Sequence, residues 1–215
     1  MLTVGRTPKH DPPVKALFKA IRHGDLDRVR QLLDKDPKLV AAVARQPPKK
    51  DDGQSPLQVA FKTGRFDIAD LLVDRGADVN FMERDSVNNW RAPVIHDAIR
   101  AAVFSSRFPG AGGELISTKE RFERALTSLS KIIDAGADVH ASDSYGNNCL
   151  MRAAADANQL EIADRNADLL EDLARVFQTL VNAGADFAEK TSTRDSVLES
   201  FRTRSVARFF SIKKP

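Results

Sequence analysis

The side chains most able to do chemistry in this sequence are four histidines and a single cysteine. A zinc site needs such ligands in close pairs, because one helical turn or one short loop must bring two of them to the same ion. His10, His23, His96 and His140 are scattered and share no such spacing with Cys149. A metal site is therefore not expected. Cys149 is predicted to be a small, semi-buried thiol, since a reactive thiol needs a nearby base.

A glycine-rich segment, PGAGGELIS at positions 109–117, is the other pattern that suggests chemistry. Phosphate-binding loops follow a strand and are followed by Lys and then Ser or Thr, and this segment has neither neighbour. We expect a flexible surface insertion instead. The sequence also assembles no nucleophile with a base and an orienting partner. We therefore expect no enzymatic activity, no cofactor and no small-molecule substrate.

Composition describes a chain that can bury a core: 42% of its 215 residues are hydrophobic. The N-terminal segment lacks an apolar stretch of signal-peptide length, and no segment reaches the roughly 18 apolar residues of a membrane span. One cysteine excludes an internal disulfide and fits a reducing compartment. We expect a cytoplasmic protein, although a periplasmic protein would agree with the same observation.

The elements that position these side chains are clearest between residues 53 and 80. Ser55 is expected to cap a helix that begins at Pro56, and Gly64 is expected to end it. A second helix follows, with apolar residues at helical spacing, and ends at Gly76. This stretch resembles the ankyrin repeat, whose pattern is G-x-T-P-L-H-x-A-A-x-x-G, an amphipathic helix and then G-A-D-V-N. Here Ser replaces the Thr, and Gln replaces the His.

The pattern recurs along the chain and predicts an all-α ankyrin-repeat solenoid of about four helix-turn-helix repeats plus a C-terminal capping half-repeat. Residues 1–13 are expected to be a polar lead-in, and residues 14–215 a single domain. The third repeat is split, because its start near Pro93 lies far from its end at Gly136. The repeats are expected at residues 14–50, 51–85, 86–142 with an inserted loop at 105–120, and 143–190, followed by a cap at 191–215.

Several residues have an expected structural role within these repeats. The alanines at positions 20, 60, 98 and 153 are expected to let helices approach closely. The resemblance implies that His96, in the histidine position of the repeat, bridges backbone groups between loops. Apolar residues at helical spacing before Gly184 predict a long outer helix in the fourth repeat.

The resemblance implies a protein-binding scaffold that uses a preformed concave face, at little entropic cost. Trp90 and Tyr145, the only Trp and Tyr, fall in polar turns. Trp, Tyr and Arg are the residue types that dominate binding hot spots. Expected contact residues are the loop tips Asp51, Asp52, Gln54, Asn89, Trp90, Arg91, Ser144, Tyr145 and Asn147, and the inner-helix ends Lys62, Thr63, Arg100 and Asp156.

The expected partner is another protein, and the expected state is a monomer away from membranes. The chain resembles stand-alone bacterial ankyrin proteins, which implies an adaptor or an antidote, an immunity-type protein that sequesters a toxin or effector. The alternative is binding of nucleic acid or an acidic surface through the basic C-terminal segment, where Arg and Lys alternate with Phe201, Phe209 and Phe210. We favour a closing helix for that segment.

Overall fold

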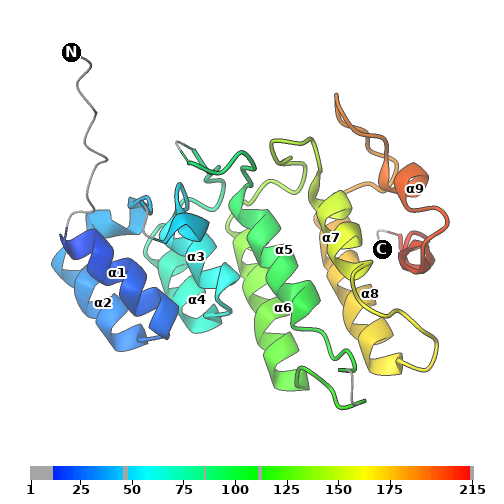
Figure 1. Ribbon diagram of the computed structural model, residues 1–215, viewed down its shortest axis with the longest axis horizontal. Helices are drawn as coiled ribbons and strands as arrows, with labels where there is room; N and C mark the ends of the chain where they lie inside the picture. Colours follow the sequence, from blue (N-terminus) through cyan, green and yellow to red (C-terminus); the bar gives the residue numbers. More distant parts are fainter. Residues whose placement is uncertain (1–11, 46–47, 85, 111–112, 214–215) are drawn as a thin grey trace. The chain divides into compact units, whose positions relative to one another are not determined.

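The structure, a computed structural model, describes residues 12–45, 48–84, 86–110 and 113–213 (Figure 1). Within these residues the regular structure is helical, and extended pairing is limited to two isolated bridges. The all-α prediction is confirmed. The helices are α1 (Pro12–His23), α2 (Leu26–Lys35), η1 (Pro37–Ala41), η2 (Lys49–Asp51), α3 (Pro56–Lys62), α4 (Phe66–Asp74), α5 (Val94–Phe104), α6 (Lys119–Asp134), α7 (Cys149–Ala157), α8 (Ala167–Asn182), α9 (Val197–Ser200) and η3 (Ser205–Phe209), where η marks a 3-10 helix.

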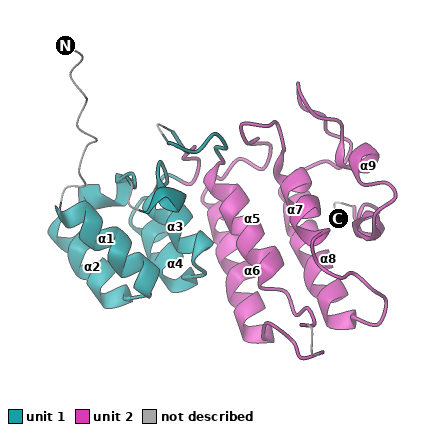
Figure 2. Cartoon of the chain, viewed as in Figure 1, with its two compact units in different colours: residues 1–78, 83–91 teal, residues 79–82, 92–215 magenta. Residues whose placement is uncertain are grey.

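The chain divides into two compact units, which Figure 2 colours separately. Unit 1 comprises residues 1–78 and 83–91, and unit 2 comprises residues 79–82 and 92–215. The expected polar lead-in falls largely on residues 1–11, outside the described residues, and α1 already begins at Pro12. A single domain over residues 14–215 stays a prediction.

Each unit repeats the same packing of helix pairs. In unit 1, α1 packs on α2 and α3 on α4, while α1 contacts α3 and α2 contacts α4. In unit 2, α5 packs on α6 and α7 on α8, and the neighbouring pairs contact each other in the same way. Within each unit, the two helices of a pair therefore bury apolar residues against each other and against the other pair of that unit. None of the helices in the described part of the chain combines the length and apolar character needed to cross a membrane.

Local sequence signals explain where these helices begin. Ser55 accepts a hydrogen bond from the Gln58 backbone, and the Gln58 side chain accepts one from the Ser55 backbone, so both exposed donors at the start of α3 are satisfied. Thr118 caps α6 by accepting a hydrogen bond from the Arg121 backbone nitrogen. The four alanines expected at close helix contacts are all buried. The predicted long outer helix is α8, with 16 residues.

The C-terminal end of unit 2 is closed by a cluster of phenylalanines. Phe177 of α8 stacks on Phe209 of η3 with ring centroids 5.2 Å apart, and Phe187 lies 5.2 Å from Phe210. Burying such rings contributes several kcal/mol, roughly 3–5 for each in comparable cores. The closing helix predicted for the basic C-terminal segment is wrong: that segment contains only the 3-10 helix η3, and the four-residue α9 comes before it. Phe209 and Phe210 of this segment both pack near Phe177 of α8.

The predicted insertion begins where α5 ends, and an arginine fixes its first residues to α8. Arg107 donates to the Asp172 carboxylate from its backbone nitrogen at 2.8 Å, from Nε at 3.0 Å and from Nη2 at 2.7 Å. Asp168 and Glu171, one turn before and beside Asp172, also pair with this guanidinium. The hydrogen bonds to Asp172 raise the pKa of Arg107 above its usual range. Asp172 is fully buried, so Arg107 provides the hydrogen bonds that a buried carboxylate requires.

This arrangement predicts that Asp172→Ala destabilises the protein by about 3 kcal/mol, because the substitution leaves a buried guanidinium without its main acceptor. Asp168→Ala provides a matched control, since Asp168 pairs with the same arginine but is half-exposed. It should change the free energy of unfolding by no more than about 1 kcal/mol. Urea denaturation of both variants measures the difference, and equal losses would show that burial of Asp172 does not decide the cost.

Candidate functional site

Two of the residues that suggested chemistry, His96 and Cys149, are buried, whereas His23 and His140 are exposed and His10 lies outside the described residues. His96 in α5 is 1% exposed, and its Nε2 lies 3.2 Å from the Ala141 carbonyl oxygen, so it contacts one loop. The expected bridge between two loops is not seen among the described residues, because the Nδ1 atom has no hydrogen-bond partner there. Burial lowers the pKa of His96 to about 4. Cys149 is buried at the start of α7, and burial raises the pKa of its thiol above the usual range. A neutral imidazole and a protonated thiol at these places support the fold.

In unit 1, two aspartates anchor the loop before α3. The Asp51 Oδ2 atom accepts from Arg22 Nε at 2.6 Å, and its Oδ1 lies 3.4 Å from Lys62 Nζ. The Asp52 Oδ2 atom accepts from the Val87 backbone nitrogen at 2.8 Å. Both carboxylates are buried. Their contacts therefore fix the loop before α3 from the inside of the fold.

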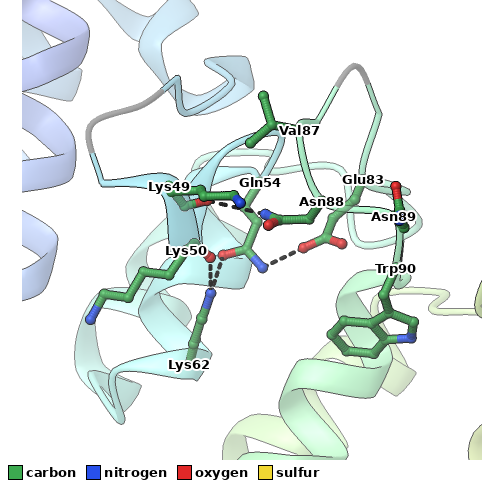
Figure 3. Close-up of a pocket in the computed structure, with 9 residues that line it drawn as sticks. All are labelled: Lys49, Lys50, Gln54, Lys62, Glu83, Val87, Asn88, Asn89 and Trp90. Carbon is green, nitrogen blue, oxygen red and sulfur yellow. Dashed lines mark hydrogen bonds between the residues drawn. The ribbon is translucent and has the colours of Figure 1, made fainter.

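A buried amide and carboxylate join this loop to the following one in the same unit. The Gln54 Nε2 group donates to Glu83, and Gln54 Oε1 accepts from Lys62 Nζ at 3.1 Å. The Asn88 side chain donates to the Lys49 carbonyl oxygen at 3.1 Å. Figure 3 shows these contacts linking the two loops across the top of α3. Long side chains on both loops are thus fixed before any partner binds.

Between these two loops lies an open pocket of about 410 Å³, which we call the lysine pocket (Figure 3). The volume lies in the range of roughly 300–1,000 Å³ that is usual for binding sites. The loops can approach because Gly53 has φ +85° and no side chain; a Cβ there would lie 2.6 Å from the Ser86 Cβ. The pocket is lined by Lys49, Lys50, Gln54, Lys62, Glu83, Val87, Asn88, Asn89 and Trp90.

Unit 2 has a separate charged cluster at the ends of its inner helices. The fully buried Asp156 of α7 accepts from Arg152 Nε at 2.8 Å and from Arg100 Nη1 of α5 at 3.1 Å. Burial raises the pKa of Asp156, and the two arginines oppose that shift. The Arg100 guanidinium also lies 5.0 Å from the centre of the Phe104 ring. Arg100 is therefore held in one orientation at the surface.

Tyr145 lies at the tip of a rigid loop in unit 2. Asp143 shapes the turn by accepting from the backbone nitrogens of Tyr145 at 2.9 Å and Asn147 at 3.0 Å. The Tyr145 carbonyl oxygen accepts from Arg194 Nε at 3.1 Å. The residue itself is 50% exposed, so the ring is presented to solvent on a fixed backbone.

The predicted contact residues separate into two groups. The first group is buried and consists of Asp51, Asp52, Gln54 and Asp156. The interpretation of these side chains as exposed is therefore wrong. Ion pairs and hydrogen bonds to neighbouring elements hold them inside the fold. Participation of the whole set in partner binding stays a prediction. The others are at least partly exposed: Lys62, Thr63, Asn89, Trp90, Arg91, Arg100, Ser144, Tyr145 and Asn147.

Five residues of the lysine pocket were absent from the sequence-based set: Lys49, Lys50, Glu83, Val87 and Asn88. The two lysines belong to the segment RQPPKKDD, which the sequence indicates only as extra residues between two repeats. The two adjacent lysines beside a repeat turn were the one sequence signal that could have indicated a binding site. Glu83 and Asn88 carry no such signal, because their positions follow from how the two loops meet.

Comparison with protein families gives a match over residues 5–83 to the family model described as ankyrin repeats in three copies. A rat protein named "Ankyrin repeat and SAM domain-containing protein 6" is 36% identical over 76 residues, which are 35% of this chain and 8% of the relative. The human "Ankyrin repeat and SOCS box protein 6" is 28% identical over 141 residues, 66% of this chain and 25% of the relative. The chain thus spans only a small part of the curated relatives that it matches.

The burial of His96 predicts a pH dependence of stability. Its pKa is about 4 in the folded protein and about 6.5 in an unfolded chain, so only the unfolded state gains a proton as the pH falls below 6.5. The stability is complete above that pH and is lost progressively towards pH 4. Between pH 7 and pH 5 the loss due to this residue should be about 2 kcal/mol.

Denaturation of the His96→Gln variant at both pH values measures this loss. The variant should lose less stability on acidification than the wild type, by that same amount, whereas the exposed His23→Gln control should keep the wild-type dependence. An unchanged dependence in His96→Gln would contradict a neutral, buried imidazole.

Proposed function

This chain is an ankyrin repeat protein, and on that premise we propose that it is a non-catalytic module that binds a partner protein through exposed loop tips and inner-helix ends. Ankyrin repeats are in general protein–protein interaction modules and in general not enzymes. The side chains of His96 and Cys149 are buried, which agrees with a structural role for both residues.

One observation carries the proposal. The partly exposed Trp90 and the exposed Tyr145 lie on loops whose backbones are fixed by buried polar contacts: those of Asp51 and Asp52 in unit 1 and those of Asp143 in unit 2. A rigid loop loses little conformational entropy on binding, so the contacts that it makes contribute more fully to affinity. Aromatic rings and cations on such loops are the side chains that typically anchor a protein partner.

We further propose that the protein acts as an adaptor or as an antidote that sequesters a toxin or effector. The names of its relatives combine ankyrin repeats with a SAM domain or a SOCS box, which supports a role as an adaptor. The antidote form rests on the resemblance to stand-alone bacterial ankyrin proteins. An adaptor holds two partners at once, whereas an antidote abolishes the activity of one. We also propose that the protein is a monomer in the cytoplasm, because a free buried thiol fits a reducing compartment.

The alternative, nucleic-acid binding by the basic C-terminal segment, is weakened by how that segment packs. Phe209 is buried against Phe177, and Phe210 lies against Phe187, so neither ring is a free platform for stacking bases. The Arg208 guanidinium pairs with Asp164 at 2.5 Å. Lys214 lies outside the described residues.

The proposed function predicts that Tyr145→Ala weakens partner binding by roughly 2 kcal/mol or more while the free energy of unfolding stays within about 0.5 kcal/mol. The reason is that the ring is exposed and the backbone contacts of the loop remain. The partner is first captured with the tagged wild-type chain and identified, and its affinity for each variant is then measured by calorimetry.

The matched control is Ile116→Ala, which removes an equally exposed apolar side chain from the insertion of the same unit. It should leave affinity unchanged. Tyr145→Ala with early melting would make the ring a packing element. A loss of affinity confined to Ile116→Ala would place the partner on the insertion.

The packing of the C-terminal segment predicts no measurable binding of DNA or RNA at physiological salt. Fluorescence anisotropy with labelled single-stranded and duplex oligonucleotides over a series of salt concentrations tests this expectation. Tight binding that weakens steeply with salt would indicate displacement of counterions by Arg and Lys and would favour the alternative function.

A further inference from the structure

In and around the lysine pocket, the positively charged side chains are exposed and the negatively charged ones are buried. Its three lysines, Lys49, Lys50 and Lys62, are exposed, while Glu83 and the neighbouring Asp51 are buried. The acidic groups are used internally, Glu83 by Gln54 and Asp51 by Arg22. The described residues of these loops therefore present mainly positive charge to solvent.

Two of the three lysines are available for a ligand. Lys62 is directed inward, because its Nζ donates to the Lys50 carbonyl oxygen and to Gln54. Neither the Lys49 nor the Lys50 ammonium group has a hydrogen-bond or ion-pair partner among the residues that the structure describes. Figure 3 shows the Lys50 side chain extending away from the Gln54–Glu83 contact. The carbonyl oxygens of both residues are already bonded, so their backbones are fixed while their charges are not.

We propose that the lysine pocket binds an acidic segment of the partner protein, with Lys49 and Lys50 as the cationic anchors for its carboxylates. This inference rests on the proposed protein-binding function and specifies the chemistry of the partner. Trp90 and Val87 line the same pocket and provide apolar contact for the methylene groups of an Asp or Glu side chain. The amides of Asn88 and Asn89 can exchange hydrogen bonds with the backbone of an extended segment.

The dimensions favour a protein segment over nucleic acid. A pocket of about 410 Å³ accommodates a short stretch of side chains. Tight binding of a nucleic acid requires a groove that follows several phosphates with one cation after another. In the described part of this pocket the exposed cations are confined to the η2 turn and the end of α3. So few exposed lysines can pair with one or two carboxylates of a bound segment.

The test is selection of a random peptide library displayed on phage against the immobilised full-length chain, followed by anisotropy with the enriched peptides. The double variant Lys49→Glu/Lys50→Glu is compared with the wild type. Lys35→Glu is the matched control, because Lys35 is an exposed lysine of the same unit outside the pocket. Thermal melting checks that both variants are folded, and Lys49→Gln/Lys50→Gln removes the charges without reversing them. Oligothymidylate is included as a competitor.

We expect enriched peptides rich in Asp and Glu whose binding weakens by on the order of tenfold or more in the charge reversal, less in the Gln variant and not in Lys35→Glu, with a clear dependence on salt. Enriched peptides without acidic residues, bound equally by the charge-reversed variant, would overturn this inference and leave the protein-binding function standing. Peptides displaced by oligothymidylate at equal concentration would also overturn it, in favour of nucleic acid. The absence of any enriched peptide would contradict both.

Discussion

Three buried aspartates, each paired with arginine, fix the parts of this protein that its helices alone would leave loose. Asp51 holds the loop before α3, Asp156 joins α5 to α7, and Asp172 holds the start of the insertion. A buried carboxylate is costly unless it is paired and hydrogen-bonded, so each position tolerates only the geometry that supplies its partner. The helix stack provides stability through apolar burial, and these pairs determine which loop conformation accompanies it.

This constraint has a direct consequence for binding. Because Asp51, Asp52 and Glu83 are used inside, the described side chains that the unit 1 loops expose are mainly cations, amides and apolar groups such as Val87 and the partly exposed Trp90. In unit 2, Tyr145 is exposed on the loop that Asp143 shapes. The backbones of these loops are already ordered, which reduces the entropic cost of forming a complex. A loop held only by apolar contacts could slide or repack at small cost. The buried ion pairs therefore trade some stability for a defined surface, which is the property that a binding module requires.

The sequence allowed the helices to be predicted well, because apolar spacing, glycines and capping residues act over a few neighbouring residues. Ser55 caps a helix where expected, and the alanines at positions 20, 60, 98 and 153 are buried. The site was predicted only in part. Asp51 finds Arg22 29 residues away, and Arg107 finds Asp172 65 residues away. No local pattern reports such pairings, so side chains assigned to loop tips from the repeat pattern were found to support the loops from inside.

The central claim is that the lysine pocket is held in shape by buried polar contacts before a partner binds. Native-state hydrogen exchange measures this most directly at the Gly53 and Val87 backbone amides, which donate to the Ala44 carbonyl oxygen and to Asp52. We expect both amides to be protected in the free wild-type protein by on the order of a hundredfold or more. In the Arg22→Leu variant the protection at Gly53 should fall while the amides of α4 remain protected. Exchange of both amides at unprotected rates in the wild type would contradict the claim.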